Sequence, residues 1–243
     1  MIGDILSKYS FDPLTLEEAK HFPSFMHRYD VKFIVPMVKL DLLLEHLSSN
    51  YRVLVVEGSM LQEYRNDYYD TADYTFAKDH FRGKRPRFKI RKRCYLSSND
   101  AFWERKTKIV KGEIQKKRVK IKGNSFSDIP EEFCTPFTSS ELSCSLENKY
   151  FRISFYSHQR TEKITLDIGL KIRIEEDWFP LLEDNMIIEI KGEKNRTDFS
   201  QYLKSQKIYP LKLSKYCVGI GSKHPEIYPH KLKEVLNYIK RAR

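Results

Sequence analysis

Apolar and polar residues alternate with a period of two along most of the chain after residue 63. This alternation is typical of strands that bury one face and leave the other polar. Glycines and the tetrapeptide SSND interrupt it where the chain is expected to turn. The pattern predicts strands at about 64–70, 86–95, 101–108, 114–122, 150–157, 162–168, 170–177 and 186–191.

The segment ahead of these strands combines one more strand with a helix. The stretch RYDVKFIV has the composition of a strand. Pro36 follows it at a place where prolines favour the start of a helix. Val38, Leu42, Leu43 and Leu47 then recur at helical spacing, which predicts an amphipathic helix.

Eight or nine antiparallel strands are enough to close a barrel, and a chain of 243 residues suits one domain of this kind. We therefore expect an α+β fold in which about eight strands form a closed antiparallel β-barrel tunnel with flanking helices. The expected parts are a capping segment at 1–26, with a helical turn near 16–22, and the barrel at 27–221, with an irregular or helical insertion at 126–149. A basic amphipathic helix at 230–243 packs on the barrel wall or contacts a membrane surface.

The net charge of +11 predicts an anionic partner, which could be nucleic acid, a membrane surface or a phosphorylated small molecule. The four cysteines contain no C-x-x-C pair, so free thiols in a reducing compartment are expected. No segment has the pattern of a signal peptide or of about 20 consecutive apolar residues. These features predict a cytoplasmic protein.

Cations share one face of three successive predicted strands, because side chains alternate between the two faces of a strand. The residues on these faces are Arg87, Lys89, Arg91, Arg93, Glu104, Lys106, Lys108, Lys116, Arg118, Lys120 and Lys122. One such face alone is typical of a half-solvated strand. Three adjacent ones predict a bound polyanion, because like charges opposite one another destabilise a sheet.

Acidic residues join the cations in the later strands. Asp167 and Glu189 lie among Lys163, Lys171 and Lys191 on the polar faces. They could form ion pairs, but a carboxylate beside bound phosphate is also how proteins hold Mg²⁺ or Mn²⁺. Glu189 is the residue that we predict to bind such a metal.

Nine short motifs occur in one order along most of the chain: RYDVKF, YYDT, RFKIRKRCY, FWERKTK, KKRV, YFRISF, KITLD, IIEIK and LSKY. In these motifs the sequence resembles the catalytic domain of the vacuolar transporter chaperone (VTC) family, which is related to the triphosphate tunnel enzymes. The resemblance covers residues 28–221. It differs from the wider superfamily at its first motif, where Arg28, Asp30 and Lys32 replace E-x-E-x-K, and at Lys163, where an arginine is expected.

The resemblance implies a set of phosphate-binding residues and a metal ligand. With Lys89 added from the shared strand face, the phosphate-binding set is Lys32, Lys89, Arg91, Arg93, Lys106, Lys116, Arg118, Lys163, Lys191, Ser214 and Lys215. The members expected to act in catalysis are Lys32, Arg91, Arg93, Lys106 and Lys215. Glu189 would hold Mn²⁺ or Mg²⁺. Tyr68, Tyr69 and Asp70 of the YYDT motif are expected to be structural.

By the same resemblance the protein is an enzyme, a polyphosphate polymerase that transfers the γ-phosphate of ATP to inorganic polyphosphate. Its partners would be ATP, polyphosphate and a separately encoded membrane protein. One alternative is a tunnel triphosphatase that hydrolyses tripolyphosphate or a nucleoside triphosphate. The other is a binder of polyphosphate or nucleic acid without catalysis, but the alternation places Phe88 and Trp103 away from the cations, and this disfavours base stacking and hence nucleic acid.

Overall fold

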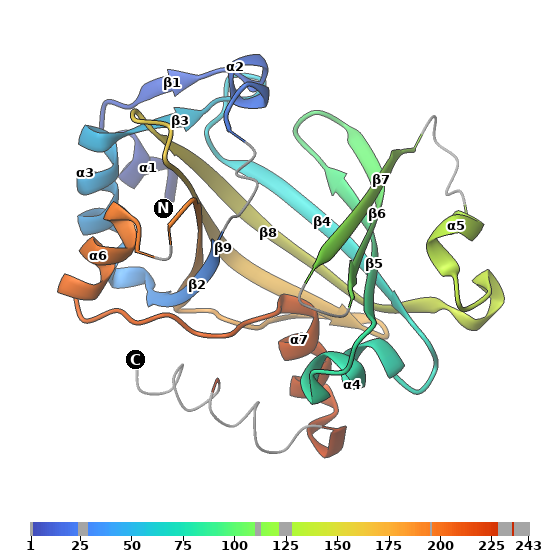
Figure 1. Ribbon diagram of the computed structural model, residues 1–243. Coiled ribbons are helices and arrows are strands. Elements are labelled where there is room, and N and C mark those ends of the chain that lie inside the picture. The colour runs from blue at the N-terminus through green and yellow to red at the C-terminus, as the bar shows by residue number, and fades with distance from the viewer. Residues whose placement is uncertain are drawn as a thin grey trace.

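The computed structural model describes residues 2–23, 29–109, 113–121, 128–194 and 196–227, together with Val235. Its centre is a curved sheet in which neighbouring strands follow the order β2-β11-β9-β8-β4-β5-β6-β7 (Figure 1). These strands are β2 (Tyr29–Pro36), β11 (Asn185–Gly192), β9 (Glu162–Ile174), β8 (Ser143–Ser157), β4 (Gln62–Asp70), β5 (Arg87–Tyr95), β6 (Asp100–Lys108) and β7 (Ile114–Lys120). All neighbours along this path are antiparallel.

Shorter elements surround this sheet. Three short strands extend it, namely β1 (Asp12–Leu14), β3 (Tyr51–Leu54) and β10 (Asp177–Pro180). The helices are α1 (Ile2–Leu6), α2 (Leu16–Lys20), α3 (Leu40–Asn50), α4 (Thr75–Arg82), α5 (Glu131–Cys134), α6 (Asp198–Ser205) and α7 (Lys215–Lys223), with 3-10 turns η1 (Met37–Lys39), η3 (Ser139–Glu141) and η4 (Pro225–Ile227). None of the helices in the described ranges is long and apolar enough to span a membrane.

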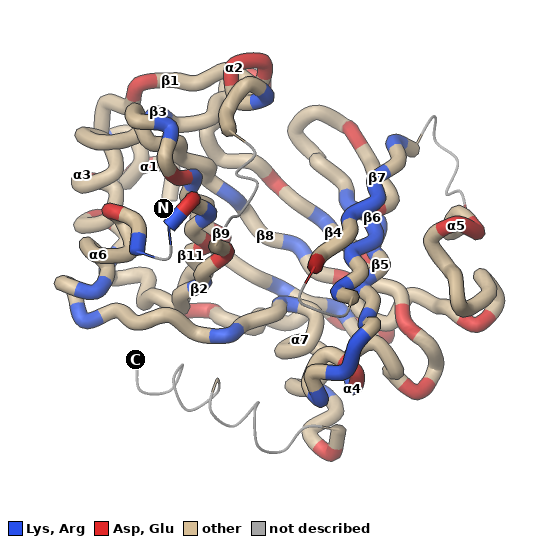
Figure 2. The backbone as a smooth tube through the Cα atoms, in the orientation of Figure 1, with Lys and Arg blue, Asp and Glu red and all other residues tan. Residues whose placement is uncertain are grey.

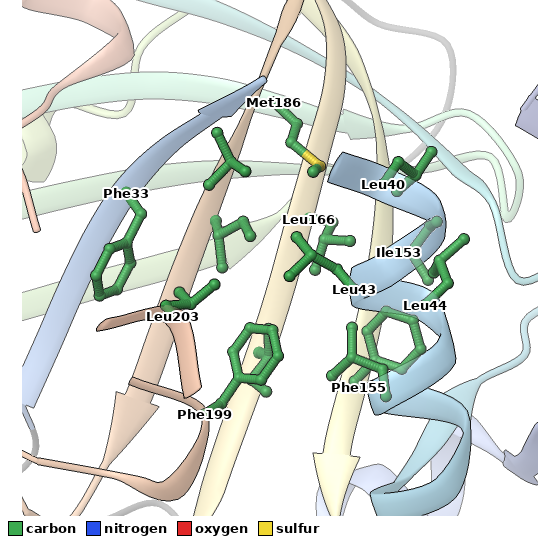
Figure 3. Close-up of a cluster of buried hydrophobic side chains, with 14 of the residues drawn as sticks. Phe33, Leu40, Leu43, Leu44, Ile153, Phe155, Leu166, Met186, Phe199 and Leu203 are labelled. Carbon is green, nitrogen blue, oxygen red and sulfur yellow. The ribbon is translucent and has the colours of Figure 1, made fainter. Parts of the chain in front are cut away.

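The main hydrophobic core lies between the outer side of β2, β11, β9 and β8 and the helices α3 and α6 (Figure 3). Leucines at spacings of three and four residues give α3 one apolar face. These leucines are Leu40, Leu43, Leu44 and Leu47, and all are fully buried. Packing against this side of the sheet leaves its other side available for polar residues.

A second core covers the outer side of β5 and β6. Phe88 and Ile90 of β5 and Trp103 of β6 pack there against Phe76 of α4 and Phe133 of α5. The apolar residues that alternate with the cations in the sequence are therefore buried on the outer side, as the period of two predicts.

The α+β architecture with an antiparallel sheet and flanking helices is confirmed, but the sheet is not closed. β2 and β7 are its two edges, and no ladder joins them within the described part of the chain. Both edges carry cations on the same side of the sheet, namely Lys32 on β2 and Lys116 and Arg118 on β7.

Two predicted boundaries were wrong. The strands expected at 162–168 and 170–177 form one long strand, β9, because Gly169 adopts a positive φ of 65° and the ladder continues past it with a local register shift. The insertion expected at 126–149 contains α5, but its last residues already belong to β8, which begins at Ser143.

Three further predictions are confirmed, and a fourth concerns residues that the structure does not describe. The helix expected after Pro36 is α3, and the helical turn expected near 16–22 is α2. All four cysteines are free thiols. The basic helix predicted at 230–243 lies outside the described residues, except for Val235, which is buried.

The main core generates a prediction about stability. Leu44→Ala should lower the free energy of unfolding by about 2–5 kcal/mol, because it removes buried methyl groups and leaves a cavity. Val38 is 90% exposed, so Val38→Ala should change that energy by no more than about 0.5 kcal/mol. Urea unfolding followed by circular dichroism would measure both, and equal effects would contradict the placement of α3.

Candidate functional site

The charged side chains of the long strands gather on the side of the sheet that faces away from the main core. Residues directly opposite one another in a ladder point to the same side. We call this side the inner face. Its charged residues include Asp30, Lys32, Lys89, Arg91, Arg93, Glu104, Lys106, Lys116, Arg118, Arg152, Lys163, Asp167, Glu189 and Lys191. Figure 2 shows how densely lysines and arginines follow β5, β6 and β7.

Glu104 of β6 is surrounded by arginines from both neighbouring strands. Its carboxylate accepts a hydrogen bond from Arg91 Nε at 2.7 Å and lies 3.4 Å from Arg118 and 3.9 Å from Arg93. Burial opposes its negative charge, but the arginines outweigh burial and lower the pKa of Glu104 to about 2. Glu104 therefore stays ionised and fixes the arginines in place.

Asp167 of β9 also holds cations in place, in a different part of the inner face. It accepts hydrogen bonds from Arg152 Nε at 2.5 Å and Nη2 at 2.7 Å, and another from Lys215 at the start of α7. Burial would raise the pKa of Asp167, yet these two cations hold it at about 2. The ion pair connects α7 to the sheet.

Glu189 of β11 lies between two lysines. Its Oε1 atom is 3.1 Å from Lys191 Nζ and 3.6 Å from Lys32 Nζ. Although burial disfavours the charge, the lysines hold the pKa of Glu189 well below its usual range. Glu189 is thus a permanent carboxylate, which is the state that a metal ligand requires.

Lysines alone form a row across β5, β6 and β7. In the ladders Lys89 is opposite Lys106, and Lys106 is opposite Lys116. Lys89 donates a hydrogen bond to Ser214 Oγ at 2.8 Å. Burial, followed by the charge of Lys89, lowers the pKa of Lys106 to about 8. This row has the charge and spacing to bind phosphate oxygens.

Aromatic rings also lie on the inner face, contrary to the expectation that they point away from the cations. Phe88 and Trp103 do point outward, but Tyr64, Tyr68, Tyr95, Phe102 and Tyr150 share the ladder positions of the charged residues. Cations cover several of these rings. For example, the Arg118 guanidinium lies 3.7 Å from the centre of the Phe102 ring. A ring already covered by arginine is less available for stacking with a base.

The VTC domain model matches residues 27–224, which is most of the chain. The protein belongs to the VTC domain family. No curated protein matches the sequence.

Solved structures of similar fold share little sequence with the chain. One is a Pyrococcus horikoshii protein with 16% identity and a TM-score of 0.50, aligned over 82% of this chain and 99% of that chain. Another, described as a proposed adenylyl cyclase from Hippeastrum with a dominant triphosphatase activity, has 15% identity and a TM-score of 0.48 over 79% and 94% of the two chains. A proposed adenylate cyclase from Bacillus halodurans has 14% identity and a TM-score of 0.48 over 78% and 96%. The first likeness supports the fold alone.

The structure of this VTC domain brings the predicted phosphate-binding residues together. All of them lie on the inner face except Ser214 and Lys215, which reach it from the start of α7. Lys163, which stands where an arginine was expected, donates a hydrogen bond to the Tyr156 hydroxyl and lies opposite Lys191. A single ammonium group there cannot make the two-pronged contact of a guanidinium. Of the unusual first motif, Arg28 lies outside the described residues.

Two inner-face residues were missed or misjudged in the sequence. Arg152 was not selected, although Ile153 and Phe155 beside it are fully buried in the core and the alternation therefore turns Arg152 inward. Tyr68 was expected to be structural together with Tyr69 and Asp70. Instead, its hydroxyl accepts a hydrogen bond from Arg91 at 3.3 Å.

We expect Arg91→Ala to weaken tripolyphosphate binding with little loss of fold. Removing the guanidinium deletes a charged phosphate ligand, which costs about tenfold or more in affinity. Arg93 and Arg118 continue to neutralise Glu104. Calorimetric titration and a thermal melt would measure both effects. Lys171→Ala, at an exposed position of β9, is the control, and unfolding of Arg91→Ala would show instead that Arg91 is mainly an ion-pair partner.

The lowered pKa of Lys106 predicts that binding depends on pH. Lysine is charged below its pKa, so raising the pH from 7 to 9 crosses the value of about 8 and removes this charge from the free protein. Affinity for tripolyphosphate should then fall by up to about tenfold. Lys106→Arg should flatten this part of the profile, because guanidinium stays charged. Identical profiles for the two proteins would assign the pH dependence to other groups.

Proposed function

We propose that this protein is a polyphosphate polymerase, which transfers the γ-phosphate of ATP to the end of an inorganic polyphosphate chain in a metal-dependent reaction. The observation that carries the proposal is the inner face, on which cations from seven of the eight long strands and from α7 converge. Such a face binds a repeating anion without contacts to bases. Membership in the VTC domain family supports an enzyme that acts on phosphates.

The arginines and lysines have different tasks in this proposal. Arg91, Arg93 and Arg152 are held by carboxylates or amides and present fixed donors to phosphate oxygens. Lys89, Lys106 and other lysines supply point charges that follow the length of a phosphate chain. Pre-positioned donors need little reorganisation during the reaction, and this is the main source of catalysis in phosphoryl transfer.

The transfer itself needs no covalent intermediate with the protein. An oxygen of the chain's terminal phosphate forms a bond to the γ-phosphorus, and the bond from that phosphorus to the β–γ bridging oxygen breaks. ADP leaves with the bonding electrons. The attacking oxygen is already anionic near neutral pH, so no side chain must remove a proton.

Three inner-face carboxylates are suited to holding cations and not to removing a proton from water. Hydrolysis by general base catalysis would require a group that accepts a proton from water near neutral pH. Glu104 and Asp167 have a pKa of about 2, and that of Glu189 is also well below its usual range. These groups are therefore poor bases.

A divalent cation fits one position on the inner face. Glu189 is a permanent carboxylate, and both neighbouring lysines contact the same oxygen, Oε1. The described residues contain no cluster of three His, Cys, Asp or Glu side chains that could hold a metal alone. Mg²⁺ or Mn²⁺ would thus rely on Glu189 and on substrate phosphates, a common arrangement for Mg²⁺. The metal would neutralise charge on the phosphates.

Incubation with ATP and Mn²⁺ or Mg²⁺ tests the proposal. The products would be resolved on a gel stained for polyphosphate, while ADP and orthophosphate are measured. Polyphosphate together with ADP is the expected result. Release of orthophosphate without chain growth would identify a triphosphatase, and binding without turnover would identify a polyphosphate binder.

Glu189→Gln should reduce metal-dependent turnover by about 100-fold, within the range seen when one charge-stabilising group is removed from an active site. Polyphosphate affinity measured without metal should remain or increase, because Lys32 and Lys191 lose a competing anion. Glu193→Gln, an exposed position just beyond β11, is the matched control. Unchanged kinetics of Glu189→Gln would refute its role as a metal ligand.

A further inference from the structure

The Tyr68 hydroxyl lies where several phosphate-binding cations meet. Tyr68 is opposite Arg91 in the ladder between β4 and β5, and its ring lies 5.9 Å from the Arg91 guanidinium. The charges of Arg91, Arg93 and Lys215 all act on its hydroxyl, and together they lower the pKa of Tyr68 although burial raises it. Lys89 is also within electrostatic range of Tyr68.

Packing fixes the direction of this hydroxyl. The Tyr68 ring stacks on the ring of Tyr216 in α7, with centroids 5.0 Å apart and an angle of 18° between the planes. Tyr216 is itself held by a hydrogen bond from its hydroxyl to Asp70. Only 6% of Tyr68 is exposed. Because Tyr216 covers one face of the ring and the backbone of Tyr68 is held in the sheet, the hydroxyl is the part of Tyr68 that is left to contact a ligand.

The hydroxyl has a proton to donate, and among the described residues it donates no hydrogen bond. Its oxygen accepts the hydrogen bond from Arg91 Nη1. A phenol has one donor as well as acceptor capacity. Buried donors are rarely left without an acceptor. The charged groups with the strongest effect on Tyr68 are all cations, namely Arg91, Arg93 and Lys215. The missing partner is therefore expected to be an anion.

We propose that the Tyr68 hydroxyl donates a hydrogen bond to the phosphate group that Lys89, Arg91, Arg93 and Lys215 bind together. This assignment rests on the proposed function for the phosphate ligand, and it adds a neutral donor to a site otherwise built from cations. A neutral donor is directional and stabilises one phosphate position, whereas the surrounding charges attract any part of the chain. Tyr68 thereby sets the register of the phosphates.

Titration of the 243-residue chain with tripolyphosphate, without ATP, tests the proposal. Tyr68→Phe keeps the stacked ring and removes only the hydroxyl, so the dissociation constant should rise by about 10- to 100-fold, the range for a hydrogen bond to a charged group. Tyr69→Phe is the control. Tyr69 follows directly in the same strand but points to the outer side, where it packs on Trp103. The affinity of the Tyr69→Phe variant for tripolyphosphate should therefore equal that of the wild type.

A second measurement does not depend on the variant. The wild-type chain with 3-fluorotyrosine at position 68 should show a ¹⁹F shift when tripolyphosphate is added, and the same label at position 69 should not. Unchanged affinity of Tyr68→Phe, or no shift at position 68, would overturn the assignment. If the wild-type protein itself fails to bind tripolyphosphate, the proposed function fails instead, and the two failures are thus distinguishable.

Discussion

The repulsion between like charges on neighbouring strands is the constraint to which the rest of this structure responds. Lys89, Lys106 and Lys116 lie directly opposite one another on three adjacent strands, an arrangement that destabilises a sheet. The two apolar clusters on the outer side supply the compensating stability. The two edges of the sheet, β2 and β7, are not joined by a ladder within the described residues.

Carboxylates divide the cations of the inner face into two classes. Arg91 and Arg152 form ion pairs with Glu104 and Asp167, and their positions are thereby fixed before any ligand arrives. The lysine row that contains Lys106 keeps an excess of charge, and burial together with the cost of that excess lowers the pKa of Lys106. A polyanion would relieve this cost along the row. Binding energy should therefore come mainly from the lysines and orientation from the arginines.

The period of two was sufficient to predict the antiparallel sheet, its polar face and most of the residues on it. It failed where the backbone breaks the period, as at Gly169 in β9, and where a strand begins in a serine-rich segment, as at Ser143. Arg152 was missed because it stands alone between apolar residues rather than in a run of cations. Whether the two edge strands pair, and where α7 lies on the inner face, depends on contacts between residues far apart in the sequence. A local pattern does not contain this information.

The YYDT motif shows how one short segment can couple the site to the fold. Alternation turns Tyr68 to the inner face and Tyr69 to the outer core, where it packs on Trp103. Asp70 ends the strand and accepts hydrogen bonds from the backbone of α4 and from Tyr216 of α7. Because Tyr216 also stacks on Tyr68, the start of α7 is held against the inner face. Lys215 thus reaches Asp167 from a helix that this motif positions, which explains why its place was not evident from the strands alone.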